Sequence, residues 1–286
     1  MPVNAEDLTI VFPVRPGASS LMARILVCSI RKFMPAGVRI TAVAPRHATP
    51  PQPDTLDLFE ELRVERRAIE TPLFFRHNVQ GLLKVDAASA GYDTPQVLLL
   101  NPNCMILAPC DLRDLRLAAN GFSARPTFRK TLFEGEDAEA LNALAAERFG
   151  LDTSAPQGGM GFQTFNSGVV LFARDSCVPG QWGRVVTEFL GSKAGGDAVM
   201  ADVDQLGLGV MAARAGGDFT QLAAKYNMLP WERRSATLVQ YFGLAELIRT
   251  ARTRDVLLTL AAVADDRGLN LLGEIEPRDI RQLAQG

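Results

Sequence analysis

The chain has 286 residues, of which 47% are apolar and 22% charged, as expected for a globular protein with a sizeable core. Thirty basic residues stand against 32 acidic ones, so the formal charge of -2 provides no overall field that would attract nucleic acid or an anionic membrane. No run of about 18 apolar residues is present, and we therefore expect no transmembrane segment.

The cysteines and the N-terminal region favour a cytoplasmic protein. The four cysteines form no Cys-x-x-Cys pair and lie mostly in apolar surroundings, which favours buried free thiols over a metal or redox motif. Acidic residues directly precede the first apolar run, which is the wrong charge for a secretion signal. Free thiols persist in a reducing compartment, and we expect the cytoplasm.

Short apolar runs alternate with stretches of helical spacing along the chain. Strands are predicted at residues 8–14, 38–45, 62–69, 96–100 and 167–172. Helices are predicted at residues 20–33, 78–90, 182–190 and 203–213. The Pro-rich residues 45–54 are predicted to form a loop. This alternation predicts an α/β layer structure with right-handed crossovers.

Two segments depart from the alternation. Residues 127–161 combine a charged helical piece with a Gly-rich hinge, which is typical of an insertion over one end of the sheet, either as a cover for an active site or as a plain surface excursion. Residues 244–286 have helical spacing and are predicted to form a helical C-terminal extension. The main domain is therefore predicted to span residues 1–243.

Polar residues follow the ends of the apolar runs, where ligands bind in open parallel sheets. Arg15 follows the first run, Asn101-Pro102-Asn103 follows "QVLLL", and Asn166 precedes "SGVVLF". Asn, Pro and Gly are also common turn residues, so each position has an ordinary structural explanation as well.

The order of these motifs resembles the GT-A fold glycosyltransferases, especially the glycogenin and galactosyltransferase-like group. The segments are "GLLKVDAASAGYDTPQVLLLNPNCMIL", "FQTFNSGVVLFARD", "DVDQLGLGVMAA", "LAAKYNML" and "LVQYFG", so the resemblance covers roughly residues 8–243. It implies a mixed, mostly parallel central sheet flanked by helices. It also implies a nucleoside-diphosphate sugar donor, while the saccharide, lipid or protein acceptor stays open.

The resemblance assigns roles position by position. Lys84 matches a basic residue near the donor, and Asn166, Ser167 and Gly168 match the segment beside the sugar. Asp204 and Gln205 match the pair that faces the reacting carbon and are the expected catalytic residues. Asp204 could instead cap the helix that it opens, so both roles stay open for it.

Three positions depart from the family's pattern. The Asp-x-Asp pair that holds Mn²⁺ or Mg²⁺ in the family is replaced by Asn101 and Asn103, and the closing histidine is replaced by Gln240. Neutral amides are weak ligands for a hard divalent cation, so we expect no metal cofactor. The amides can still contact ribose or phosphate, and an "NPN" turn can also simply end the strand.

Without a metal ion, positively charged side chains must neutralise the negative charge that develops on the departing diphosphate. Lys84 is the first candidate, with an exposed helix lysine as the ordinary alternative. Arg15, Arg76 and Lys225 are further candidates, for each of which an ordinary surface role is the better explanation.

Three functions stay open. The first is a cytoplasmic glycosyltransferase that needs no divalent cation. The second is a non-catalytic nucleotide-sugar-binding or scaffold protein with the same fold. The third is a sugar-phosphate nucleotidyltransferase, which "FPVRPGASS" disfavours because a Gly-rich basic loop is expected there and only one glycine is present.

Overall fold

The computed structural model describes residues 3–117, 121–127, 135–153, 160–192, 196–214, 219–229, 232 and 236–241. These residues build a seven-stranded sheet in the order β3-β2-β1-β4-β7-β6-β8. Its strands are β1 (Leu8–Pro13), β2 (Arg39–Pro45), β3 (Glu65–Ile69), β4 (Gln96–Leu100), β6 (Phe122–Pro126), β7 (Phe165–Ala173) and β8 (Phe219–Gln221). A separate two-stranded sheet pairs β5 (Cys104–Ile106) with β9 (Leu238–Gln240).

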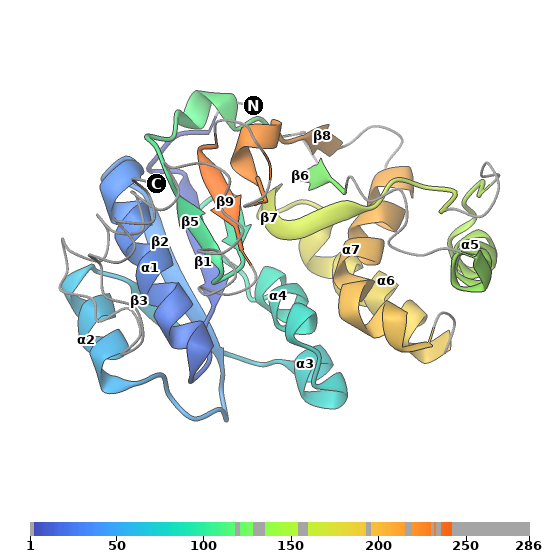
Figure 1. The fold of residues 1–286 in the computed structure, drawn as a ribbon, viewed down its shortest axis with the longest axis horizontal. Coiled ribbons are helices and arrows are strands. Elements are labelled where there is room, and N and C mark those ends of the chain that lie inside the picture. Colours follow the sequence, from blue (N-terminus) through green and yellow to red (C-terminus); the bar gives the residue numbers. More distant parts are fainter. Residues whose placement is uncertain are drawn as a thin grey trace, which may run out of the picture.

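Helices cover both faces of the main sheet. They are α1 (Ala18–Phe33), α2 (Pro53–Glu61), α3 (Pro72–His77), α4 (Gln80–Ala88), α5 (Gly135–Phe149), α6 (Val178–Ser192) and α7 (Gly196–Arg214), with short 3₁₀ turns η1 (Leu112–Asp114) and η2 (Ala224–Tyr226). Figure 1 shows α5 at the far end of the molecule, beyond α6 and α7. None of the helices in the described ranges is long and apolar enough to cross a bilayer.

The direction of β7 determines where the site can form. β1 to β4 run parallel, whereas β7 runs antiparallel to both of its neighbours, β4 and β6. Leu100 at the end of β4 is paired with Val169, so the amino end of β7 lies beside the carboxyl end of β4. The predicted mixed, mostly parallel sheet flanked by helices is confirmed.

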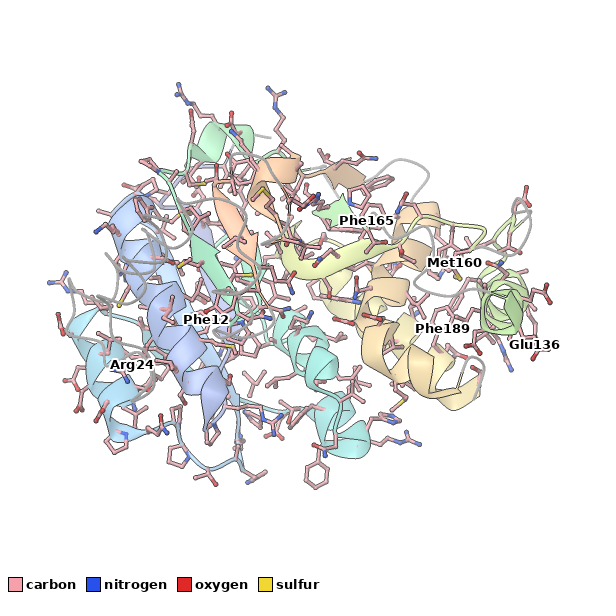
Figure 2. All side chains as sticks on the ribbon, viewed as in Figure 1. Phe12, Arg24, Glu136, Met160, Phe165 and Phe189 are labelled. Carbon is pink, nitrogen blue, oxygen red and sulfur yellow. The ribbon has the colours of Figure 1, made fainter. Side chains whose placement is uncertain are left out.

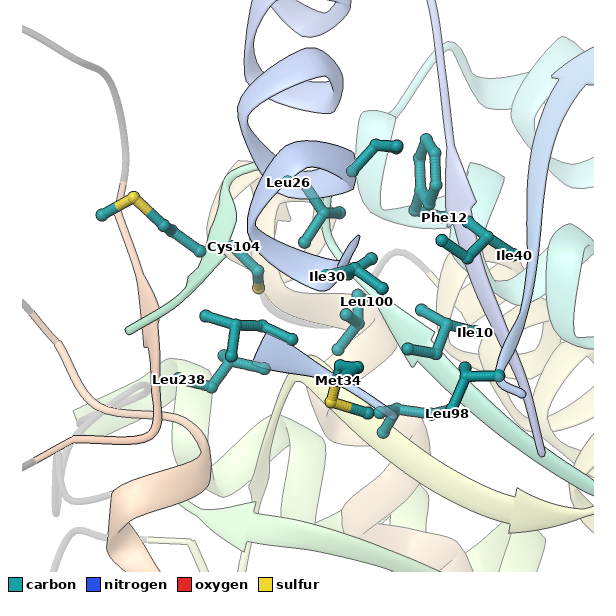
Figure 3. Packing of buried hydrophobic residues seen from close by; sticks show 14 of the residues in the cluster. Ile10, Phe12, Leu26, Ile30, Met34, Ile40, Leu98, Leu100, Cys104 and Leu238 are labelled. Carbon is teal, nitrogen blue, oxygen red and sulfur yellow. The ribbon is translucent and has the colours of Figure 1, made fainter. Parts of the chain in front are cut away.

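Alternating side chains of the central strands feed two separate cores. Ile10 and Phe12 of β1 pack with α1 and α2 on one face, whereas Val11 packs with α4, α6 and α7 on the other. Figure 3 shows the first core, where Leu26 and Ile30 of α1 lie against β1 and β4. Because both faces are buried, the central strands are continuous apolar runs rather than alternating ones.

Several predicted elements differ in their bounds. The helix predicted at residues 78–90 is the shorter α4, and the unpredicted α3 precedes it. Asn78 separates the two helices in the left-handed conformation (φ 53°), which Asn tolerates. α2 begins inside the predicted 45–54 loop, because Pro53 suits the first turn of a helix. α7 contains the predicted helix, which begins at Val203 after a kink at Asp202, and has an additional, unpredicted part that begins at Gly196. β5, β6, β8 and β9 are short and were not predicted.

The two unusual segments are described only in part. The charged piece of the 127–161 insertion forms α5, while residues 128–134 and 154–159 lie outside the described residues. The extension predicted at residues 244–286 also lies outside them, so the 1–243 boundary stays a prediction.

Replacing Phe59 with alanine should destabilise the protein strongly. Phe59 is fully buried on α2 and meets the Phe12 ring edge-on at 5.9 Å. Loss of a buried aromatic ring costs about 3–5 kcal/mol, which urea unfolding monitored by circular dichroism would measure. Phe75→Ala is the matched control, since Phe75 is 85% exposed and its loss should change stability by less than about 0.5 kcal/mol. Equal effects of the two changes would contradict this packing.

Candidate active site

A buried ion pair forms the centre of the candidate site. Lys84 Nζ of α4 lies 2.7 Å from Asp204 Oδ2 of α7, and the two side chains are only 6% and 4% exposed. Ser167 of β7 bridges them, since its Oγ donates to Asp204 Oδ2 at 2.6 Å and accepts from Lys84 Nζ at 2.7 Å. Lys84 also donates to the Ser167 carbonyl at 3.3 Å. Three predicted site residues from distant parts of the chain are thus in direct contact.

Both alternatives considered for this pair need correction. Lys84 is not an exposed helix lysine, because packing of α4 against β7 and α7 buries it. Asp204 does not cap a helix: the part of α7 that follows the kink at Asp202 begins at Val203, and the Asp204 carboxylate bonds Ser167 and Lys84 instead. Since the Lys84 charge is neutralised by Asp204, Lys84 is also not a free cation for a diphosphate.

Gly81 and Trp182 allow α7 to pack closely around Asp204. A Cβ atom on Gly81, one turn before Lys84, would lie 3.1 Å from Asp204 Oδ1, so only glycine leaves this carboxylate oxygen uncrowded. Trp182 of α6 is fully buried and its Nε1 donates to the Asp204 carbonyl at 2.9 Å. Sequence reasoning missed both residues, although a glycine inside a helix is a recognisable indication of close approach.

Gln205 lies at the kink of α7. It is half-buried, and its Nε2 donates to Oδ1 of Asp202, the residue whose backbone leaves the helical conformation. Gln205 therefore sits next to the ion pair without belonging to it.

The turn after β4 joins the start of β7. Asn101 N donates to the Gly168 carbonyl at 2.9 Å, and Cys104 N donates to the Asn101 carbonyl at 3.1 Å to close the turn. Asn166 Oδ1 accepts from Gly168 N at 2.7 Å, so this amide shapes the entry into β7. The predicted residues Asn101, Asn166 and Gly168 therefore lie together.

Gln240, the last of the three presumed metal-ligand positions, lies on β9, which pairs with β5 beside the turn after β4. Gln240 is paired with Cys104, and Tyr241 N donates to the Asn103 carbonyl at 2.9 Å. Gln240 is 7% exposed and its amide lies directly on Gly168, where an added Cβ would come within 2.0 Å of Oε1. We expected this glycine to admit a sugar; its open face is instead covered by the Gln240 amide.

The donor set at these positions does not suit a divalent cation. Asn103 Oδ1 and Gln240 Oε1 are buried and have no hydrogen-bond partner within the described residues. Both are neutral oxygens, whereas Mg²⁺, Mn²⁺ and Ca²⁺ prefer carboxylates. Among the same residues no three His, Cys, Asp or Glu side chains gather as a metal-binding group. These unpartnered amide oxygens instead favour a ligand group that donates hydrogen bonds, such as a hydroxyl.

Arg15 lies on the turn after β1 and contacts α3. Its guanidinium lies 4.8 Å from the centroid of the Phe74 ring, and Ser20 Oγ donates to the Arg15 carbonyl at 2.8 Å to brace the turn after β1. Asp86 of α4 holds α3 in place, accepting from the amides of Leu73 at 3.3 Å and Phe74 at 2.9 Å. Arg76 is exposed on α3, and Lys225 is paired with Asp114, so neither is placed at the ion pair by these contacts.

Two further buried residues, Cys104 and Arg125, lie near the site. Burial raises the pKa of Cys104 to about 12, so this thiol is protonated at neutral pH and is no nucleophile. Arg125 of β6 is 3% exposed, pairs with Asn166 in the sheet, and forms an ion pair with Glu232. Sequence reasoning missed Arg125 because nothing in "SARPTF" distinguishes it from a surface arginine.

Lys84→Met should be strongly destabilising, because it leaves Asp204 buried without its counter-charge. We expect a loss of about 3–5 kcal/mol in urea unfolding. Lys84→Met combined with Asp204→Asn should be less destabilised than Lys84→Met alone, since no uncompensated charge remains. Lys225→Met is the matched control: its ion pair with Asp114 is over 40% exposed on both sides and should contribute at most about 1 kcal/mol. A larger loss for Lys225→Met than for Lys84→Met would refute the assignment.

Asp86→Asn should change how stability depends on pH. Burial raises the pKa of Asp86 to about 6 from an ordinary value of 3.8, against the opposing effect of its two amide bonds. The folded state therefore takes up a proton, and this group's contribution to stability falls as pH rises from about 4 to about 6.

The stability of Asp86→Asn relative to the unchanged protein should accordingly be about 1 kcal/mol more favourable at pH 7.5 than at pH 5. Urea midpoints at the two pH values measure this. A difference that is the same at both pH values would show that Asp86 is not perturbed.

Comparisons with known proteins bear on the fold. No protein-family model and no curated protein matches the sequence. Among solved structures, an active-site mutant of LgtC aligns with a TM-score of 0.61 at 13% identity, over 90% of this chain and 95% of that one. Mouse xyloside xylosyltransferase 1 aligns with a TM-score of 0.50 at 11% identity, over 82% and 97% of the two chains.

The bifunctional glycosyltransferase WbbM aligns with a TM-score of 0.57 at 12% identity, over all of this chain but only 53% of its own. At such identities the likeness concerns the fold alone. The chain has the GT-A glycosyltransferase fold that its motif order predicted.

Proposed function

We propose that the protein is a glycosyltransferase that moves a sugar from a nucleoside-diphosphate sugar to a saccharide, lipid or protein acceptor without a divalent cation. The observation that carries this proposal is the buried contact of Lys84, Ser167 and Asp204 at the junction of β4 and β7. A charged pair is costly to bury, so a functional role explains its presence at the ligand-binding end of a GT-A sheet better than stability does.

In this proposal Asp204 acts on the sugar. Its Oδ2 is held by Ser167 and Lys84, while Oδ1 has no hydrogen-bond partner within the described residues and faces Gly81. Oδ1 can therefore accept a hydrogen bond from a sugar hydroxyl, and the carboxylate would stabilise positive charge that develops on the sugar ring. Lys84 holds the Asp204 carboxylate in its orientation through the ion pair. Gln205 beside it positions the acceptor or the sugar.

Side-chain amides and Arg15 would bind the departing diphosphate. Asn101, Asn103 and Gln240 carry amide groups that can donate to phosphate oxygens, and Arg15 can supply charge from the turn after β1. Lys84 is removed from this role by its ion pair with Asp204. A cytoplasmic location is part of the proposal, supported by the four cysteines, none of which forms a disulfide.

Incubation with a panel of nucleoside-diphosphate sugars in EDTA tests the proposal. We expect donor hydrolysis or transfer that EDTA leaves unchanged, and a loss of about 100-fold in turnover for Gln205→Ala, whose half-buried side chain lies outside the ion pair. Retained thermal stabilisation of Gln205→Ala by nucleotide is the control for folding and binding. Absence of donor hydrolysis and of transfer for every nucleotide sugar of the panel would contradict the proposed glycosyltransferase activity.

A variant that carries the family's metal ligands tests whether the unchanged protein works without a divalent cation. Asn101→Asp, Asn103→Asp and Gln240→His together should give Mn²⁺-dependent nucleotide binding in calorimetry, while the unchanged protein binds nucleotide equally with Mn²⁺ or EDTA. A strong Mn²⁺ site in the unchanged protein would overturn metal independence.

A non-catalytic nucleotide-sugar-binding protein is the second candidate, favoured by the Gln240 amide that covers Gly168. The two functions differ in one result: nucleotides would raise the melting temperature in both, but only the enzyme would turn donor over. If Gln240→Gly created turnover in an inactive protein, Gln240 would be identified as the obstruction.

A further inference from the structure

A groove separate from the ion pair lies where the ends of three helices meet. It has a volume of about 250 Å³ and lies between the last turn of α5, the middle of α6 and the last turn of α7. Each of these helices contributes one arginine to it: Arg148, Arg184 and Arg214. Figure 1 shows these helices together at the end of the molecule that carries α5.

The arginines of this groove are poorly compensated. Arg148 pairs with Glu147 through exposed side chains at 3.3 Å. Arg184 and Arg214 have no hydrogen bond or ion pair with any residue that the structure describes. Glu188 is the one carboxylate of the lining, so the groove has a net positive charge in a protein whose overall charge is -2.

Helix electrostatics explain only part of this arrangement. Arg148 and Arg214 lie in the last turns of α5 and α7, where a cation stabilises the carbonyl end of a helix. Arg184 lies in the interior of α6, where no such effect operates. Its convergence with the other two is therefore better explained by an anionic ligand, which two or more guanidinium groups can grip through paired hydrogen bonds.

The rest of the lining fits a sugar. Val185 is buried and the half-buried Phe149 ring lies 5.7 Å from the ring of Phe189 of α6, so the floor is apolar and held in place. Figure 2 shows Phe189 on the side of α6 that faces α5. Gln181 and Glu188 add exposed groups able to bond hydroxyls. An apolar floor with a few converging polar groups is typical of small-ligand sites, and this volume suits one or two sugar units.

We propose that this groove binds an anionic saccharide, one that carries a carboxylate or phosphate group. Arg184 and Arg214 hold the anionic group, and Phe149 contacts the apolar face of a sugar ring. Ten residues of α7 separate Asp204 from Arg214, which corresponds to about 15 Å of helix, so the groove is outside the transfer centre. The choice of a saccharide rests on the proposed function, since an acceptor chain could be held there; the anion-binding part does not.

Calorimetry with tetragalacturonate, maltotetraose and inorganic phosphate tests this site, with nucleotide absent. We expect tetragalacturonate to bind in a 1:1 ratio and maltotetraose to bind at least about 10-fold more weakly. Arg184→Gln and Arg214→Gln should each weaken tetragalacturonate binding by about 10-fold. Arg66→Gln is the control, because Arg66 is exposed on the edge strand β3 and its loss changes the net charge equally.

Each other outcome overturns the inference. Equal weakening by Arg66→Gln would mean general charge attraction, and phosphate binding without tetragalacturonate binding would mean an anion site unrelated to sugars. No binding at all would remove the site. Nucleotide-induced thermal shifts, measured on the same samples, report on the proposed transferase separately, so failure of the groove and failure of the transferase are distinguishable.

Discussion

The buried ion pair between Lys84 and Asp204 is the constraint on which the rest of the site depends. Two charges can lie in an apolar interior only when they face each other and their remaining hydrogen-bonding capacity is met. Ser167 meets part of it by donating to the carboxylate and accepting from the ammonium group. The contact therefore fixes α4, β7 and α7 relative to one another, and the absence of a side chain at Gly81 allows the close approach.

The reversed direction of β7 explains why these residues meet. If β7 were parallel to β4, Ser167 would lie at the other end of the strands, beside the amino end of β4 and away from its carboxyl end. Because β7 is antiparallel, its first residues lie against Asn101, and the later return of the chain through β9 adds Gln240 to the same place. The outcome is a junction built from neutral amides around one internally compensated ion pair.

Charge is thus distributed in two different ways. At the junction of β4 and β7 the charged groups are buried and paired, and the amide oxygens of Asn103 and Gln240 have no hydrogen-bond partner within the described residues. In the groove at the ends of α5, α6 and α7 the arginines are exposed and largely uncompensated. The two proposals are compatible, because in a transferase without a divalent cation and in a groove for an anionic saccharide the negative charge of the ligand would be met by protein groups.

The sequence by itself determined the elements with strong patterns. The continuous apolar runs of β1, β4 and β7 are dictated by burial on both faces, and the motif order predicted the GT-A fold and the clustering of Lys84, Ser167 and Asp204. Tertiary structure alone decided the burial of Lys84, the Gln240 amide on Gly168, the break at Asn78, and the roles of Gly81, Asp86, Trp182 and Arg125. These depend on which distant residues meet, and local periodicity contains no information about contacts between α4, β7 and α7. The short strands β5 and β9 form for the same reason: they are stabilised by each other and not by their own residues.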